Sequence, residues 1–234
     1  MHKLLLIFLL VPTLLIAQNR KKKDYLVSLT TQFGTMHLVL YDQTPKHKEN
    51  FIKLIDQKFY DSLLFHRIIP LFMIQGGDPN SRKAQRDDPL GSGSVGERIP
   101  AEFVATLFHK KGALAAARDN NPEKASSPNQ FYIVQGRVWD EEGWQKQLQR
   151  LESMKGRMPT DEQKQVYKTL GGSPHLDGNY TVFGEVIDGL AIVDSVAKQP
   201  RNEMDRPVKD VRMMMTGDWI KKKKITKQYG YKYQ

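Results

Sequence analysis

Residues 65–79 place a single arginine among apolar side chains, and their residue types are suited to chemistry. If residues 65–69 form a strand, side chains alternate between the two faces of a sheet, so Arg67 lies on the same face as Phe65 and Ile69. A guanidinium in such surroundings is costly to bury unless it is paired. Arg67 is therefore either a partner in a structural ion pair or a charged hydrogen-bond donor to a bound molecule.

Three blocks of the sequence resemble one protein family. Residues 65–78, FHRIIPLFMIQGGD, match the signature FHRxIPxFMxQGGD of the cyclophilin family of peptidyl-prolyl isomerases at every defined position. The second block comprises residues 111–118 and 127–133, and the third is 175–186, which contains an Asp-Gly turn signal. The blocks occur in the family's order, and the resemblance covers about residues 25–211 with one insertion.

The reaction that this resemblance implies needs no nucleophile, metal ion, cofactor or acid–base pair. The barrier to rotation about an X–Pro bond, about 18–20 kcal/mol, arises from amide resonance. A donor aimed at the imide nitrogen, which gains a lone pair as the bond twists, binds the twisted state better than either planar isomer. Arg67 is the side chain of the signature whose positive charge is certain. Accelerating the rotation ~10⁴-fold requires about 5.5 kcal/mol of such differential binding.

The resemblance also implies a substrate site around Arg67, the expected catalytic residue. Gln75 would bond the substrate backbone, and Gln130 would lie beside Arg67. Main-chain groups of Ala117 and Arg118 would hold the residue before proline. The remaining positions would form an apolar slot for the proline ring and its edge: Phe72, Met73, Tyr132, His175, Leu176 and Tyr180.

Several of these residues have a plainer interpretation. On pattern alone, a position in the barrel core is the favoured interpretation of Phe72, Met73 and Leu176, and His66 is a structural histidine because prolyl isomerisation needs no base. Three positions also depart from residues common in the family. His175 stands in place of Trp, Tyr180 in place of His and Tyr132 in place of Phe, and these changes keep the slot aromatic or apolar.

The elements that must position these residues are short strands and two helices. Alternating patterns predict a hairpin from residues 24–30 and 35–41, and helical spacing after Thr44-Pro45 predicts a helix that ends near Lys58. A second helix, capped by Asp188, would run to about residue 197. With no βαβ rhythm, the pattern indicates a mainly β, closed antiparallel barrel. The family fold is an eight-stranded barrel capped by two helices.

Residues 139–172 are an insertion within this domain. Trp144, Leu148, Leu151 and Met158 fall on one helical stripe, and a Thr160–Gln163 capping box precedes a second apolar series that ends at Leu170. We expect a helical hairpin near the rim of the pocket, because the third family block follows it directly.

The net charge of +10 is concentrated at the two ends of the chain. Every acidic residue lies between Asp24 and Asp218, so residues 24–220, the expected isomerase domain, carry a net charge of −1. Residues 18–23 and 221–234 are predicted to be solvated basic tails rather than parts of a nucleic-acid-binding face. The alternative is weak contact with an anionic membrane surface or polymer. The absence of cysteine excludes disulfides, thiol catalysis and thiolate metal sites.

Residues 1–17 have the pattern of a signal peptide. Lys3 precedes an apolar run from Leu4 to Ile16, and Ala17 is a small residue at the expected cleavage site. The alternative is a retained membrane anchor, because Leu15 is large for its position before the cleavage site. Cleavage near Ala17 would release an exported protein, which we expect in the periplasm or, as the alternative, secreted.

The sequence thus predicts an exported, monomeric prolyl isomerase acting on unfolded or nascent proline-containing polypeptides, with neither cofactor nor metal. A non-catalytic module or chaperone that binds proline segments is one alternative. An adhesion or scaffold protein built around the tails and the insertion is another.

Overall fold

The computed structural model describes residues 22–233, so the predicted signal peptide and residues 18–21 of the basic tail lie outside the described residues. Eight antiparallel strands form one sheet in the order β3-β4-β6-β5-β7-β2-β1-β8. Their bounds are β1 Lys23–Thr31, β2 Gly34–Leu40, β3 Phe65–Ile69, β4 Met73–Gly76, β5 Ala113–Ala116, β6 Phe131–Val134, β7 Val182–Asp188 and β8 Met214–Lys221.

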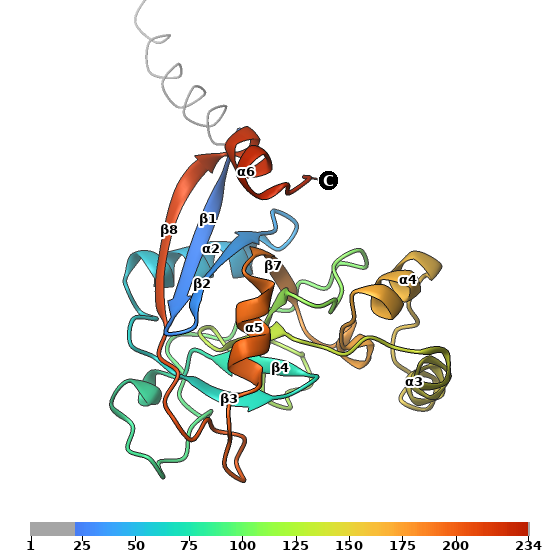
Figure 1. Ribbon diagram of the computed structural model, residues 1–234, viewed down its shortest axis with the longest axis horizontal. Helices are drawn as coiled ribbons and strands as arrows, with labels where there is room; N and C mark the ends of the chain where they lie inside the picture. The colour runs from blue at the N-terminus through green and yellow to red at the C-terminus, as the bar shows by residue number, and fades with distance from the viewer. Residues whose placement is uncertain (1–21, 234) are drawn as a thin grey trace, which may run out of the picture.

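The two edges of this curled sheet meet beside the ends of β3 and β8. Leu64 and Arg212 form an antiparallel bridge, and the N–H of Phe65 donates to the carbonyl of Val211 at 2.9 Å. The predicted mainly β barrel is confirmed, but this short contact closes it rather than a full pairing of strands (Figure 1). The closing strand β8 begins at Met214, two residues after this bridge.

The two predicted helices cover the apolar interior of the barrel. Helix α2, Pro45–Asp56, has proline in its first turn, which suits proline because that turn's N–H groups lack helical partners. It contributes Phe51 to the core, and α5, Leu190–Ala197, contributes Val193. The prediction that Asp188 caps α5 is wrong. The residue before the helix is Gly189 with φ of 85°, a conformation that favours glycine.

The insertion forms the predicted helical hairpin. Helices α3, Glu141–Ser153, and α4, Asp161–Thr169, lie to one side of the barrel (Figure 1). The Thr160–Gln163 capping box is present. Trp139, Trp144 and Tyr167 form the small core of the insertion. Met158 and Leu170 do not join it, since they are 45% and 39% exposed.

The carboxyl end of the chain is folded, which corrects the prediction of a solvated tail over 221–234. Lys221 completes β8 opposite Lys23 of β1, and α6 follows as Lys222–Tyr229. Ile225 of α6 is completely buried, and Tyr229 contacts the ring of His37 at 4.9 Å between centroids. A lysine run looks solvated in sequence, but in α6 the lysines flank Ile225 and Tyr229, which pack on the rest of the fold.

Candidate active site

One row of residues across the sheet carries the centre of the site. Arg67 of β3 lies opposite Gln75 of β4, and Gln75 lies opposite Tyr132 of β6. A register shift between Phe65 and Arg67 marks a bulge, so Phe65 points into the barrel core instead of sharing the face of Arg67 as alternation predicted. Ile69 does share that outer face.

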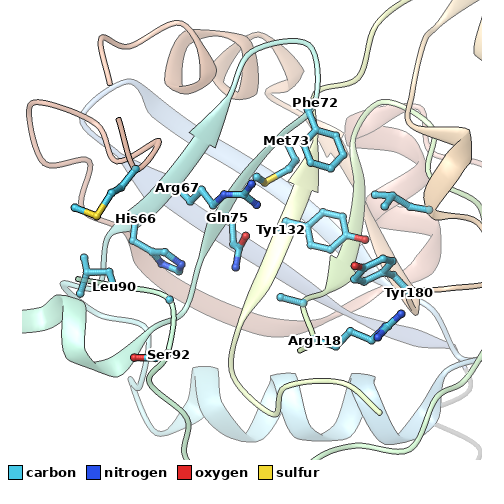
Figure 2. Close-up of a pocket in the computed structure, with 14 residues that line it drawn as sticks. His66, Arg67, Phe72, Met73, Gln75, Leu90, Ser92, Arg118, Tyr132 and Tyr180 are labelled. Atoms are coloured by element: carbon cyan, nitrogen blue, oxygen red, sulfur yellow. The ribbon is translucent and has the colours of Figure 1, made fainter. Parts of the chain in front are cut away.

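These residues line a pocket of about 400 Å³ on the outer face of the barrel (Figure 2). Nine of the eleven predicted site residues take part in its wall. The full lining is His66, Arg67, Phe72, Met73, Gln75, Leu90, Gly91, Ser92, Ala117, Arg118, Tyr132, Leu176, Tyr180 and Met204.

An apolar slot occupies one side of the pocket. Met73, Tyr132 and Leu176 are at most 8% exposed and belong to an apolar cluster outside the barrel core. Phe72 and Tyr180 pack against this cluster, and the rings of Tyr132 and Tyr180 meet edge to face at 6.0 Å. The slot therefore offers a proline ring a surface of apolar and aromatic groups, which favours its transfer from water. These side chains are not part of the barrel core, the plainer interpretation of their pattern.

Arg67 lies beside this slot with its charge partly compensated. Its side chain is 43% exposed, and its Nε lies 3.5 Å from Oδ2 of Asp205. In Figure 2 the guanidinium extends between Met73 and Gln75. Because a guanidinium has five N–H donors, pairing of the Nε edge with Asp205 leaves donors for a molecule in the pocket.

Gln130 bonds Gln75, the residue that lies opposite Arg67 in the sheet. Its side-chain oxygen accepts from the amide of Gln75 at 3.2 Å, and its own amide donates to the carbonyls of Gly91 and Gly93, each at 2.9 Å. Gln130 is 6% exposed and is not among the lining residues. It therefore orients Gln75 and fixes the loop around residue 92.

His175 also lies behind the pocket wall rather than on it. Its ring stacks on Phe72 with centroids 5.5 Å apart. Burial lowers the pKa of His175 to about 4, so the ring is neutral at pH 7. Its contribution to the slot is to support Phe72.

Ala117 and Arg118, the two positions predicted to bind substrate through their main chain, differ in how they are held. The N–H of Ala117 donates to the carbonyl of Gln130 at 2.9 Å, and its carbonyl accepts from Ser127 at 2.8 Å. Ala117 thus contributes chiefly its small side chain to the pocket. Arg118 is held at the edge, where Nε donates to the carbonyl of Asn179 and the guanidinium lies 4.7 Å from the centroid of Tyr180.

Sequence reasoning missed the loop that forms the far side of the pocket. Residues 90–92 and Met204 line it. Asp78, the last residue of the signature, holds that loop because its buried carboxylate accepts from the N–H groups of Gly91 and Gly93. The acidic residue at the end of the signature was the available signal.

His66 lines the pocket and is only 3% exposed. Burial lowers the pKa of His66 to about 4, although nearby Asp78 opposes the shift. Above pH 6.5 the lowered pKa of His66 has no effect on stability, because the ring is neutral in both the folded and the unfolded chain. As pH falls from 6.5 towards 4, the unfolded chain binds a proton that the folded protein does not, so stability decreases.

We therefore expect His66 to lower the free energy of unfolding by about 2 kcal/mol between pH 7 and pH 5. Urea denaturation of the wild type and His66→Phe at both pH values measures this. The pH-dependent loss should be about 2 kcal/mol smaller in the variant, because the variant lacks the contribution of His66. Other buried histidines remain, so part of the loss should persist in the variant. Equal losses in the two proteins would contradict this assignment.

Comparison with known proteins agrees with this geometry. The family model described as "Cyclophilin type peptidyl-prolyl cis-trans isomerase/CLD" matches residues 26–218. A protein of Streptococcus pyogenes, whose provisional name combines a phosphatase and a peptidyl-prolyl cis-trans isomerase, is 37% identical over 79% of this chain and 37% of its own length. A protein of Staphylococcus haemolyticus, also provisionally named a peptidyl-prolyl cis-trans isomerase, is 34% identical over 79% of this chain and 86% of its own.

A solved structure of the same family shares the fold of this chain. A crystal structure of a cyclophilin-type peptidyl-prolyl cis-trans isomerase from Cryptosporidium parvum superimposes with a TM-score of 0.60 and 22% identity, covering 84% of this chain and 98% of that one. The chain spans little more than a third of the length of the Streptococcus protein. The matched family model, the relatives and the fold together show that this chain belongs to the cyclophilin-type peptidyl-prolyl cis-trans isomerase family.

Proposed function

We propose that this protein is a peptidyl-prolyl cis-trans isomerase acting on proline-containing segments of unfolded or newly exported polypeptides. The observation that carries the proposal is the guanidinium of Arg67 beside an apolar slot, with Gln75 opposite it in the sheet. The slot suits the proline ring, and Arg67 suits the nitrogen of the twisted imide. A charge-assisted hydrogen bond in a partly dry pocket is the kind of contact that strengthens in a transition state.

A module that only binds proline segments is the second candidate. It would use the same slot but would not require a donor specific for the twisted state. A protease-coupled isomerisation assay on an X-Pro peptide distinguishes the two functions, because a pure binding module would not accelerate the exchange of isomers. The catalytic proposal predicts acceleration by the wild-type protein.

Export of a monomer is the setting we propose for this activity. The support is the apolar run from Leu4 to Ile16 behind Lys3, with the first mature residue expected near Gln18. Across residues 22–233, no helix has the length and apolar character to cross a membrane. Sequencing the N-terminus of the protein from the cell envelope tests this proposal, and an intact Met1 on a membrane-bound form would favour the anchor instead.

Lys22 and Lys23 lie beside the start of the carboxyl-terminal basic run in the fold. Lys23 pairs with Lys221 across β1 and β8, and the N–H of Lys222 donates to the carbonyl of Lys22 at 2.9 Å. The exposed lysines of this basic face are Lys22, Lys221, Lys223, Lys224, Lys227 and Lys232. Each lysine near an anionic bilayer contributes about 1 kcal/mol, so we propose weak contact of the basic face with anionic lipid.

The prediction is that replacing Lys223, Lys224 and Lys227 by Gln weakens binding to anionic vesicles at least tenfold at low salt. Co-sedimentation with phosphatidylglycerol-containing and phosphatidylcholine vesicles measures it. The matched control replaces the exposed residues Lys46, Lys53 and Lys83, which lie outside the basic face, and should bind like the wild type. Equal binding to both lipids, or equal loss in both triple variants, would contradict the proposal.

A further inference from the structure

A chain of buried polar side chains joins the helical insertion to the proline slot. The hydroxyl of Tyr132 lies 2.9 Å from Nε2 of His109, and Nδ1 of His109 lies 2.8 Å from Oδ1 of Asp177. The hydroxyl of Tyr167 donates to Oδ2 of the same carboxylate at 2.7 Å. All four residues are at most 5% exposed.

The proton positions in this chain follow from its chemistry. A carboxylate only accepts, so in a neutral imidazole Nδ1 carries the proton and Nε2 accepts from Tyr132. Burial raises the pKa of Tyr132 and of Tyr167, which keeps both hydroxyls protonated. The main-chain N–H of His109 also donates to Asp177, at 2.9 Å. Because each hydroxyl, ring nitrogen and carboxylate oxygen has a partner, the chain is expected to be rigid.

The two ends of the chain belong to different parts of the molecule. Tyr132 forms a wall of the slot, as Figure 2 shows, and a phenylalanine at this position would lack the hydroxyl that anchors it to His109. Tyr167 lies in α4, where its ring packs 5.9 Å from that of Trp144 and 5.4 Å from that of Phe108. Since Asp177 bonds both Tyr167 and His109, the insertion supplies the last hydrogen bond of a network that ends in the slot.

We propose that the insertion is a positioning element, in which Tyr167 fixes Asp177 and thereby holds Tyr132 as a rigid wall of the proline slot. This inference rests on the proposed isomerase activity. Tyr167 does not line the pocket and acts only through the chain. A wall that is already ordered loses less side-chain freedom when substrate binds, so its rigidity strengthens binding.

This role predicts a particular kinetic signature. The slot contacts the proline ring in the cis, trans and twisted states alike, so weakening the wall removes uniform binding and raises KM without lowering kcat. Partial unfolding would have the opposite signature, because it lowers the active concentration and hence apparent kcat while leaving KM unchanged. The two explanations are therefore separable in one experiment.

The test is Tyr167→Phe in the full-length protein, which removes one hydroxyl and keeps the ring. We expect KM for an X-Pro peptide to rise three- to tenfold while kcat stays within twofold. The matched control is Leu151→Ala, which opens a cavity in the buried part of α3 but removes no member of the chain. Its KM should stay within twofold of the wild type, at a temperature where circular dichroism shows every variant folded.

A double-mutant cycle tests whether Tyr167 acts through Tyr132. Once Tyr132→Phe has removed the terminal hydroxyl, adding Tyr167→Phe should not raise KM further. The ¹⁹F resonance of 3-fluorotyrosine at position 132 should shift in Tyr167→Phe and not in Leu151→Ala. If Tyr167→Phe does not fold, Asp177→Asn should raise KM in its place.

The opposite outcomes are equally clear. An unchanged KM in the folded variant, or additive effects of the two tyrosine substitutions, would overturn the positioning role while the wild type remains active. A wild-type protein without isomerase activity would instead refute the proposed function.

Discussion

Arg67→Ala is expected to lower kcat and kcat/KM by similar factors of roughly 10²–10³, a loss of about 3–4 kcal/mol, as when one oxyanion-hole donor is removed. The reason is that the guanidinium gains its strongest partner only when the imide nitrogen becomes pyramidal. Loss of a contact made chiefly in the transition state lowers both constants together. Since Arg67 is 43% exposed and bonds only Asp205 among the ion pairs of the described residues, its removal should leave the fold intact.

Two further substitutions serve as controls for Arg67. Arg67→Lys should recover little activity, because an ammonium does not reproduce the planar fork of the guanidinium. Phe72→Ala should instead raise KM, because it removes apolar surface that contacts proline in every state. The protease-coupled assay measures all three variants after circular dichroism has shown that they are folded. Nearly full kcat/KM in folded Arg67→Ala would refute the catalytic role.

Lys48→Met is expected to lower the free energy of unfolding by about 3–5 kcal/mol, the typical cost of leaving a buried charge without its partner. Lys48 is 7% exposed and donates to Oδ1 of Asp24 at 2.7 Å and to the carbonyl of Leu40 at 2.9 Å. Asp24 itself is 3% exposed. The lysine thus joins α2 to the first two strands of the barrel.

Guanidinium denaturation at pH 7 measures this loss as a shift of the midpoint at constant slope. Lys46→Met, in the same helix but exposed, should lie within about 0.5 kcal/mol of the wild type. Adding Asp24→Asn to Lys48→Met should restore part of the stability, because it removes the uncompensated charge. No recovery in the double variant would mean that lost packing of the lysine side chain, not the charge, causes the effect.

The helical insertion is attached to the barrel at a single place. The main chain of Arg137 meets that of Gly172 in a bridge, so residues between them leave and rejoin the barrel at one place. Such an arrangement permits a long excursion without disturbing strand order. Our inference is that Tyr167 of the insertion acts on the site by donating a hydrogen bond to Asp177, a residue that also belongs to the third family block.

Much of the site was predictable because the family signature is a contiguous run of residues. Met73 and Gln75 belong to that run, and both line the pocket. The helix that follows Thr44 and the Thr160–Gln163 capping box were equally accessible, since their signals lie within a few residues of one another.

Other parts of the site depended on contacts between residues far apart in the chain. A bulge at Phe65 reversed the side of the sheet on which that residue lies, and no neighbouring residue type signals it. The bonds of Gln130 to the carbonyls of Gly91 and Gly93 join it to residues nearly forty positions earlier in the chain, and no local pattern signals them.

Three blocks of residues were enough to identify the family, and through that resemblance the arginine and most of the slot residues, while periodicity along single strands and helices indicated a mainly β barrel. Only the tertiary structure decided that the carboxyl-terminal lysines form a helix beside β1, and that Tyr167 reaches Tyr132 through Asp177. The physical reason is that a charged run or a lone tyrosine has no local preference strong enough to specify its partner. Its position follows from the register of strands and from buried polar groups that must each find a hydrogen bond.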